Sequence, residues 1–488
     1  MAEDKELQRG LSLPMAVFII IGMVIGSSIW VSPAAYLSRT GPAVFLAYLI
    51  AVIPAVFVAF IAAYIGSAIP VAGGSYVVNS RLTGGLAGFL TVWLILLAVG
   101  SALATLAAVL GLFLSELFLI PENMVMIFVI VVGIAVLVIF YLINFLQVKI
   151  SGAVEMIITL FGDVLVMIIF IIAAIPFYNP NNLDPIIPPQ LGLSPLLFAS
   201  LVFFFSYVGF TLILDVAGEV KNPKKNIPLA LLISIPLLVG LYTFQSLMVA
   251  AIHPWNEPVG TVTEILTKGR ILPQGAIILV TILIVVAIAS TIHPVYLAYS
   301  RDILMAGRDG LFSDKFTKVH KKYKTPIPAL TLLLVIGIIF ILIFIPLLTP
   351  EYGIATAAVL LSAFTGVAAL LIQIPLCIAA IKLPKKFPNL HKSSGFKPSI
   401  KTIKIMGMIG AIVSAVFVLL LFFDPDAGLI IALVVLPYTL IGAIVYYIRK
   451  RSLAKKGINI KDVLKKFPEE IVFEEEMPSK IERLTEEG

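Results

Sequence analysis

Long apolar stretches alternate with short polar or charged connections along the chain. A window of about 18 or more apolar residues predicts a membrane-spanning helix, because the hydrocarbon core of a bilayer is about 30 Å thick. Twelve such windows are present, at approximately 15–36, 43–66, 86–117, 124–146, 152–176, 195–217, 228–252, 273–299, 327–348, 353–381, 404–423 and 427–448. The pattern predicts an all-α, polytopic membrane protein with twelve transmembrane helices.

Two of these helices are interrupted near their middle. The first reads FIIIGMVIGSSIWVSP (18–33) and the second LVFFFSYVGFTLILDVAGEVKNP (201–223). The interruptions consist of Ile25, Gly26, Ser27 and Ser28 in the first helix and of Ser206, Tyr207, Val208 and Gly209 in the second. Unwound backbone at that depth is tolerated only where it is buried or lines a cavity. A matched pair of broken helices therefore indicates the binding site of a transporter.

Charge supports the span count and sets an orientation. Only 12% of the residues are charged and 60% are apolar, whereas a soluble domain carries about 25% charge. With both termini in the cytoplasm, 31 of the 34 Lys and Arg residues lie on the cytoplasmic side, leaving Arg39, Lys268 and Arg270 outside. This bias explains the net charge of +7 without a nucleic-acid partner. The single Cys377 excludes an intrachain disulfide.

The chain divides into three regions on this basis. Residues 1–14 form a cytoplasmic N-terminus without the pattern of a cleaved signal, 15–448 the transporter domain, and 449–488 a charged cytoplasmic tail, expected to be soluble and partly disordered. The breaks fall in the first and sixth spans. We therefore expect two inverted repeats of five helices, about 15–176 and 195–381, followed by two added helices at 404–448. The segment 301–326 is expected to form a short amphipathic helix on the membrane surface or a solvated loop.

Four stretches in order along the chain resemble the amino acid–polyamine–organocation superfamily of permeases. They are GMVIGSSIWVSP (22–33), VAGGSYVVNSRLTGGLAGF (71–89), GEVKNPKKNIPLAL (218–231), and SRDILMAGRDGLF (300–312) with KTPIPAL (324–330). The resemblance implies the fold of the sodium-coupled leucine transporter, in the cell membrane. It also implies transport of amino acids or related amines by alternating access, coupled to protons or sodium or run as exchange. No cofactor beyond such a coupling ion is expected.

The two breaks suit a zwitterionic substrate. Backbone N–H groups at Gly26, Ser27 and Ser28 begin a half-helix, whose positive end favours the substrate carboxylate. The turn at 205–209 and the carbonyls near Ile25 are expected to bind the ammonium. The resemblance places a side-chain-sensing aromatic at Phe205, and a glycine is frequent in the family where this chain has Ser28. The alternatives are that residues 26–28 form a close helix contact and that Phe205 and Tyr207 simply pack.

Asp163 is the leading candidate for coupling transport to a proton or a cation. It lies in the middle of the fifth span, where a carboxylate costs about 2.5–3.5 kcal/mol to insert. It is interpreted as a proton carrier, or as a cation ligand with Ser290 and Thr291. Pro294 supports the second interpretation because it leaves the Ser290 carbonyl without its helical partner. A structural buried acid is the third interpretation.

Asp215 is a second coupling candidate. The family frequently has an acid where this chain has Thr211, and Asp215 follows one helical turn later. Asp215 is expected either to serve gating or proton chemistry or to pair with Lys221 or Lys225. Glu116 lies at a span end and is expected at the membrane interface.

Other functional classes fit the sequence less well. A channel normally presents a filter or a ring of charges, and none is evident. An enzyme would need a metal or nucleophile cluster, whereas the four His residues and one Cys are scattered. An exchanger or a non-transporting amino acid sensor remains open, because its binding residues would look the same. The absence of a firmly placed charge in the expected pocket favours neutral or apolar amino acids.

Overall fold

The computed structural model describes residues 11–70, 73–146, 152–215, 217, 220–323, 325–425, 428–465 and 467. Within these residues all regular structure is helical, and the only strand-like pairing is one bridge between Leu11 and Val220. The all-α prediction is therefore confirmed for the described chain. The predicted segments 1–14 and 449–488 lie partly outside the described residues.

Nine long helices run unbroken through the described part of the chain. They are α3 (Val44–Ala68), α5 (Gly85–Leu117), α6 (Glu122–Phe145), α10 (Pro223–Ile252), α12 (Gln274–Arg308), α13 (Ile327–Tyr352), α14 (Ile354–Lys386), α16 (Ile400–Leu421) and α17 (Gly428–Lys455). Each coincides with one predicted span, because uninterrupted apolar sequence has no way to satisfy its backbone in lipid except as a helix.

Three predicted spans are broken instead. The first is α1 (Leu13–Val24) and α2 (Ser28–Thr40), and the sixth is α9 (Ser194–Phe203) followed by two 3₁₀ turns, η5 (Phe204–Tyr207) and η6 (Phe210–Leu214). Both interruptions lie where the sequence predicts them. The fifth span, which was expected to be regular, consists of α7 (Gly152–Ile158), the π-helical turn η2 (Thr159–Val164) and α8 (Leu165–Ala174).

Eleven segments of the described chain are long and apolar enough to cross a membrane. The first, Leu13–Ala68, has 56 residues and contains the first two predicted spans. The chain turns inside it at the short η1 (Gly41–Ala43), where Gly41 has φ 68° and its α-carbon lies against Pro188. The chain is thus a multi-pass membrane protein.

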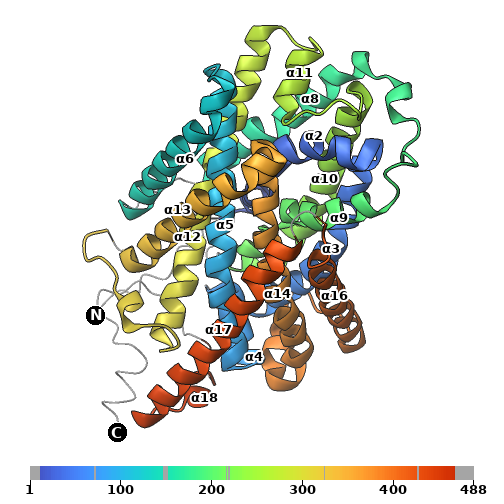
Figure 1. Cartoon of the computed structure of the whole chain (residues 1–488). Helices are drawn as coiled ribbons and strands as arrows, with labels where there is room; N and C mark the ends of the chain where they lie inside the picture. The colour runs from blue at the N-terminus through green and yellow to red at the C-terminus, as the bar shows by residue number, and fades with distance from the viewer. Residues whose placement is uncertain are drawn as a thin grey trace.

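Short helices mark the two ends of the bundle. Figure 1 shows α11 (Val262–Lys268) at one end and α4 (Gly74–Leu82) and α18 (Ile460–Val463) at the other. We call these the α11 end and the α18 end. Lys268 and Arg270 lie in or just after α11, and Arg39 lies at the end of α2, which packs against α11. The three basic residues expected outside are therefore together at the α11 end.

The expectation for 301–326 is wrong in its first part. Residues up to Arg308 continue α12, and Asp302, Leu304 and Met305 are buried in the bundle instead of lying on a membrane surface. The apolar residues that suggested an amphipathic surface helix pack against protein. The short η8 (Asp314–Thr317), with no buried residue, follows α12.

Apolar residues at the start of the tail are buried. The last turns of α17 extend to Lys455, and Ile460, Val463 and Leu464 around α18 are buried. The Phe467 ring lies 5.0 Å from the ring of Phe387, just before α15 (Pro388–Ser393). Because most residues of the tail are polar or charged, its composition did not indicate that these few apolar residues would be buried.

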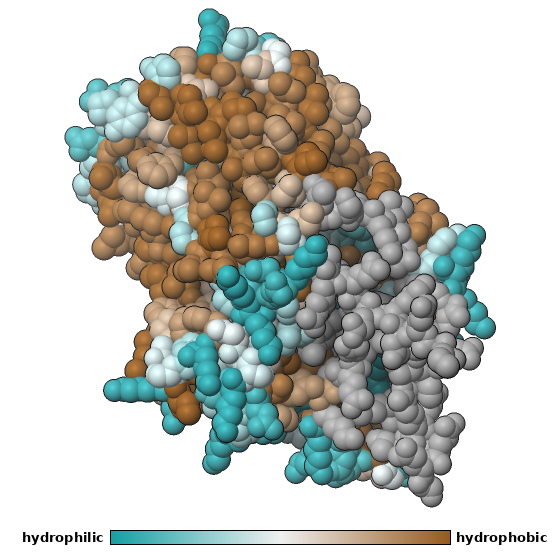
Figure 2. Space-filling view, turned by 180° about the vertical axis from the view of Figure 1, so that it is seen from behind, coloured by the Kyte–Doolittle hydropathy of each residue, from teal (hydrophilic) through white to brown (hydrophobic). Residues whose placement is uncertain are grey.

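Burial separates a central helix from lipid-facing ones. In the most apolar 18-residue stretch of α5, 94% of the residues are buried inside the protein. The corresponding shares for α6 and α17 are 17% and 22%. Helix α5 packs against α4, α6, α12, α13, α14 and α17. Figure 2 shows a broad hydrophobic surface over the upper part of the view, with hydrophilic side chains at its top edge and many more in the lower half. Such a surface suits a bilayer.

Candidate functional site

The first break opens the backbone between α1 and α2. Ile25 leaves the helix with φ −75° and ψ 85°, and the Gly26 N–H bonds two residues back to the Val24 carbonyl at 2.9 Å. Helix α2 then begins at Ser28, with Ser27 before it. The first N–H groups of a helix have no intrahelical partner and carry its positive dipole end. Ser27 and Ser28 therefore stand at an anion-favouring position.

The second break depends on Gly209. Val208 is extended, with ψ 136°, and Gly209 has φ 126°, a region that side-chain-bearing residues rarely adopt. A Cβ atom at Gly209 would lie 2.4 Å from the Met23 carbonyl oxygen. Glycine is thus required both by the backbone angle and by the close approach to the first broken helix.

The two breaks are joined by hydrogen bonds. The Ser28 and Ser206 hydroxyl oxygens are 2.6 Å apart, and Ser28 is also 2.9 Å from Ser32 Oγ. The Tyr242 hydroxyl of α10 lies 3.0 Å from the Val24 carbonyl and 3.1 Å from the Ser206 carbonyl, to which it donates. One side chain therefore bridges carbonyls from both broken helices.

A small cavity lies beside this junction, with a volume of about 40 Å³. Of the predicted substrate residues, Gly26, Phe205, Val208 and Gly209 line it, and the predicted coupling residue Thr291 joins them. We call this the break cavity. A volume of this size holds a few waters but no amino acid, so the structure is a closed state.

The other predicted substrate residues are off the cavity wall. Ser28 and Ser206 bond to each other, and the Tyr207 hydroxyl donates to the Tyr48 carbonyl of α3 at 3.1 Å. Ile25 and Ser27 are fully buried. In this closed state these side chains hold the breaks together, while the neighbouring backbone borders the cavity.

Sequence reasoning missed one side of the break cavity. Helix α5 contributes small or apolar residues, α12 adds Val295 and Tyr299, and α14 adds Thr365; the α5 residues are Ala98, Val99, Ala102 and Leu106. No polar or broken pattern marks them in an unbroken apolar helix. Among the described lining residues none is charged, and the polar groups are Thr291, Thr365 and Tyr299.

The coupling candidates of the fifth and eighth predicted spans lie on segments that pack against each other, η2 and α12. Asp163 is fully buried in the π-helical turn η2, which packs against α1 and α12. The Thr291 hydroxyl is within 3.2 Å of the Gly22 and Ala287 carbonyls, and Ser290 Oγ donates to Ala287. π-Turns are frequent at functional sites. The described residues contain no group of three His, Cys, Asp or Glu side chains suited to a metal.

Asp215 lies one turn beyond the second break and is 4% exposed. It does not pair with Lys221 or Lys225 among the described ion pairs. Its Oδ1 atom occupies the place that a side chain at Gly74 would need, at the start of α4. Asp215 thus faces the bundle interior, and its expected role in gating or proton chemistry stays a prediction.

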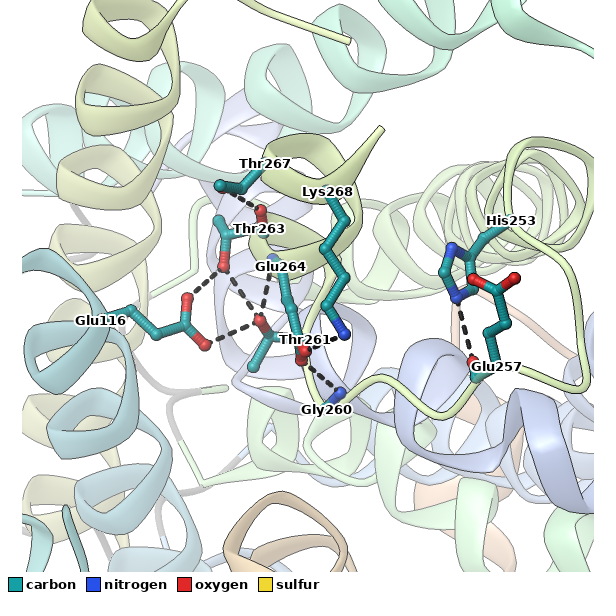
Figure 3. Close-up of polar contacts among 9 residues, drawn as sticks. All are labelled: Glu116, His253, Glu257, Gly260, Thr261, Thr263, Glu264, Thr267 and Lys268. Atoms are coloured by element: carbon teal, nitrogen blue, oxygen red, sulfur yellow. Dashed lines mark hydrogen bonds and ion pairs between the residues drawn. The ribbon is translucent and has the colours of Figure 1, made fainter. Parts of the chain in front are cut away.

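Side-chain contacts between helices hold the bundle together at both of its ends, the α11 end and the α18 end. At the α11 end, Glu116 on α5 accepts hydrogen bonds from Thr261 at 2.7 Å and Thr263 at 2.6 Å (Figure 3). Glu116, which is half-buried and lies next to the last residue of α5, thus anchors α11 at this end of the bundle. The Thr261 hydroxyl also accepts the Glu264 N–H, and the Glu264 carboxylate accepts the N–H of Gly260, one residue before the N-cap, which makes a variant of the capping box at the start of α11.

At the α18 end, a buried ion pair closes the bundle. The Arg81 guanidinium on α4 bonds both carboxylate oxygens of Asp309, which directly follows α12. Tyr76 donates to the same carboxylate at 2.6 Å, and Lys386 donates to the Arg81 carbonyl. Breaking such a pair by removing one partner costs about 3–5 kcal/mol.

Comparison with known proteins identifies a matching family and several relatives. The amino acid permease family matches residues 11–448. A branched-chain amino acid permease of Bacillus subtilis (strain 168) is 26% identical over 480 residues, covering 93% of this chain and 95% of the relative. A serine/threonine exchanger and a methylthioribose transporter of the same organism are each 26% identical, covering 70% and 67% of this chain and 78% and 73% of the relatives.

These relatives are named as transporters, and the family is one of transporters, not enzymes. The family match extends over nearly the whole described chain, including both breaks and the cavity beside them. The chain therefore belongs to the amino acid permease family of the amino acid–polyamine–organocation superfamily.

Proposed function

We propose that this protein is a secondary active transporter that moves neutral or apolar amino acids across the cell membrane by alternating access. The observation that carries the proposal is the contact of two broken helices beside a closed cavity without a charged lining residue. A cationic or acidic substrate side chain would need an opposite charge in a desolvated site. An apolar side chain needs none.

The proposal includes the twelve-helix, inverted-repeat arrangement. At about 1.5 Å per residue, 56 helical residues are far longer than the roughly 30 Å of one bilayer crossing, and the chain turns at η1, so the proposal counts Leu13–Ala68 as two spans. The breaks then fall in the first and sixth helices, as two inverted repeats require. The proposal also puts the α18 end and both termini in the cytoplasm, and the uneven distribution of Lys and Arg supports this orientation.

The substrate carboxylate binds the N–H groups at Gly26, Ser27 and Ser28, where α2 begins. The ammonium binds carbonyls of Ile25 and of the 205–209 turn, and Phe205 contacts the substrate side chain. Support comes from the free helix start at Ser28 and from Phe205 on the cavity wall. The cavity must widen to admit a substrate, so binding is linked to opening at one end.

Transport in this proposal is coupled to a proton or a cation. Asp163 is one candidate carrier, because an acid buried in a π-helical turn beside α1 and α12 lies next to the moving half-helix. Ser290 and Thr291 supply further oxygens on α12. A second mode, amino acid exchange, is favoured by the likeness to a serine/threonine exchanger.

Counterflow in proteoliposomes tests this function. We expect liposomes loaded with unlabelled L-leucine to take up external radiolabelled L-leucine. Unlabelled neutral amino acids should compete with the label, whereas L-lysine and L-glutamate should not. Saturable binding in a thermal-shift screen without counterflow by any amino acid would indicate a sensor. Neither binding nor counterflow with any amino acid would refute the proposal.

A further inference from the structure

A second small cavity lies between the break cavity and the α18 end. It has a volume of about 30 Å³ and shares Ala98, Val208, Leu212 and Tyr299 with the break cavity. Ser75 at the start of α4 and Gln373 of α14 complete its polar wall, together with Thr211, Asp215 and Asp302. We call this the acidic cavity.

The two carboxylates face the same enclosed space from different helices. Asp215 follows η6 and is 4% exposed, whereas Asp302 lies on α12 and is fully buried. The two carboxylates lie within electrostatic range of each other and of the Tyr299 hydroxyl, and the positive charge of Arg301 acts on Asp215. Two acids thus meet directly below the second break.

Several oxygens in the acidic cavity lack a hydrogen-bond donor. They are Asp215 Oδ1, both Asp302 carboxylate oxygens and Gln373 Oε1, each on a side chain less than 5% exposed. Burying two carboxylates as anions, with these oxygens lacking hydrogen-bond donors, costs several kcal/mol for each charge. A proton shared by the pair removes one charge and supplies the missing donor, as in other pairs of close carboxylates.

The position of the pair links it to the substrate. Asp215 directly follows the short η6 turn after Gly209, whereas Asp302 lies on the continuous helix α12. Tyr299 lines both cavities and stands between the pair and the break cavity. A rearrangement at the second break therefore changes the separation of the carboxylates and with it their hold on a shared proton.

We propose that Asp215 and Asp302 form a carboxylate pair that carries the coupling proton, released to the side at which the α18 end opens. This inference rests on the proposed function, because it assigns the ion that drives it. It adds Asp302, a residue that the sequence did not single out, and it moves the proton site from η2 to the acidic cavity.

The test uses the full chain in proteoliposomes with two readouts. Accumulation of L-leucine is driven by an inward proton gradient, and trapped pyranine reports proton entry; counterflow of L-leucine is measured at equal pH on both sides. The wild-type protein should accumulate L-leucine at least fivefold and acidify the lumen. Asp302→Asn and Asp215→Asn should each reduce accumulation to the equilibrium level and abolish acidification. Because neither carboxylate lines the break cavity, counterflow should stay within about threefold.

Matched variants separate the possible failures. Asp424→Asn, at a buried acid outside both cavities, should behave as wild type. Accumulation that survives in Asp302→Asn, or that is lost only in Asp163→Asn, would overturn the inference while leaving the proposed function intact. Accumulation that follows a sodium gradient at clamped pH would also overturn it. Absence of counterflow in the wild-type protein would instead refute the proposed function.

Discussion

At the scale of the residue, the site depends on a few positions where only one side chain fits. Gly209 is the clearest, because its φ of 126° and its contact with the Met23 carbonyl both exclude a Cβ atom. Tyr242 is another, because its hydroxyl reaches carbonyls on both sides of the junction. These positions hold the breaks in register, so small changes there should affect transport more than burial alone would suggest.

We predict that Gly209→Ala lowers counterflow at least tenfold. The strained backbone angle costs about 1–3 kcal/mol for a residue with a side chain, and the clash with Met23 adds to it. Gly240→Ala in α10 is the matched control, because a Cβ there meets nothing within 4 Å. It should leave counterflow and thermal stability unchanged. Equal activity of the two variants would show that the second break does not need its present geometry.

Residue types predicted the breaks but not every cavity wall. Gly26, Ser28 and Gly209 stand out in an apolar helix, so the sequence revealed where the backbone opens. Ala98 and Ala102 do not, because a small residue in an apolar helix looks the same beside lipid, another helix or a cavity. The proximity of Asp215 to Asp302 was equally hidden, since it depends on how the helices pack across 86 intervening positions.

At the scale of the element, α11 acts as a cover held by one carboxylate. Glu116 binds the hydroxyls of Thr261 and Thr263 while the capping box keeps the short helix wound (Figure 3). A helix of this length is not stable alone. Its position therefore depends on the contact with α5, and opening toward the α11 end requires these hydrogen bonds to break.

We predict that Glu116→Ala opens the α11 end. Each lost hydrogen bond to a charged group is worth about 1.5–3 kcal/mol, so the open population should rise at least tenfold. A cysteine introduced by Ala102→Cys on the cavity wall reports this by its rate of labelling with a membrane-impermeant thiol reagent. The native Cys377 is fully buried and gives little background.

Lys268→Ala is the control for this change. It removes an exposed ion pair with Glu264 on the same helix, and such pairs contribute about 0–1 kcal/mol. The labelling rate should stay near that of the protein with Ala102→Cys alone. If Glu116→Ala labels no faster than this control, α11 is not the barrier on that side.

At the scale of the whole molecule, the cavities lie between two fastened ends that differ in kind. The α11 end is held by one carboxylate on two hydroxyls, and the α18 end by the buried Arg81–Asp309 pair. The helical class and the positions of the long apolar segments could be predicted from the sequence because lipid imposes simple rules on composition. The contacts that hold the two ends could not be predicted. Arg81 and Asp309, for example, are distant in sequence and resemble ordinary charged residues of loops.

We predict that Arg81→Met destabilises the protein by about 3–5 kcal/mol, because it leaves the Asp309 carboxylate buried without its partner. The double variant Arg81→Met with Asp309→Leu removes both charges and should recover most of the lost thermal stability. Unfolding is followed by thermal denaturation in detergent. A double variant no more stable than the single one would show that the two residues do not act as a pair.

The central position of α5 has a consequence for how the family can diversify. In the most apolar stretch of α5, 94% of the residues are buried, and this helix packs against neighbours on every side. The residues of α6 and α17 are mostly exposed on the surface that would face lipid. In a saturation mutagenesis experiment, α5 should tolerate the fewest substitutions and α6 the most among apolar residues. New substrate preferences should accordingly arise through exchanges among very small side chains on α5, since each one enlarges or fills the pocket without disturbing the surrounding helices.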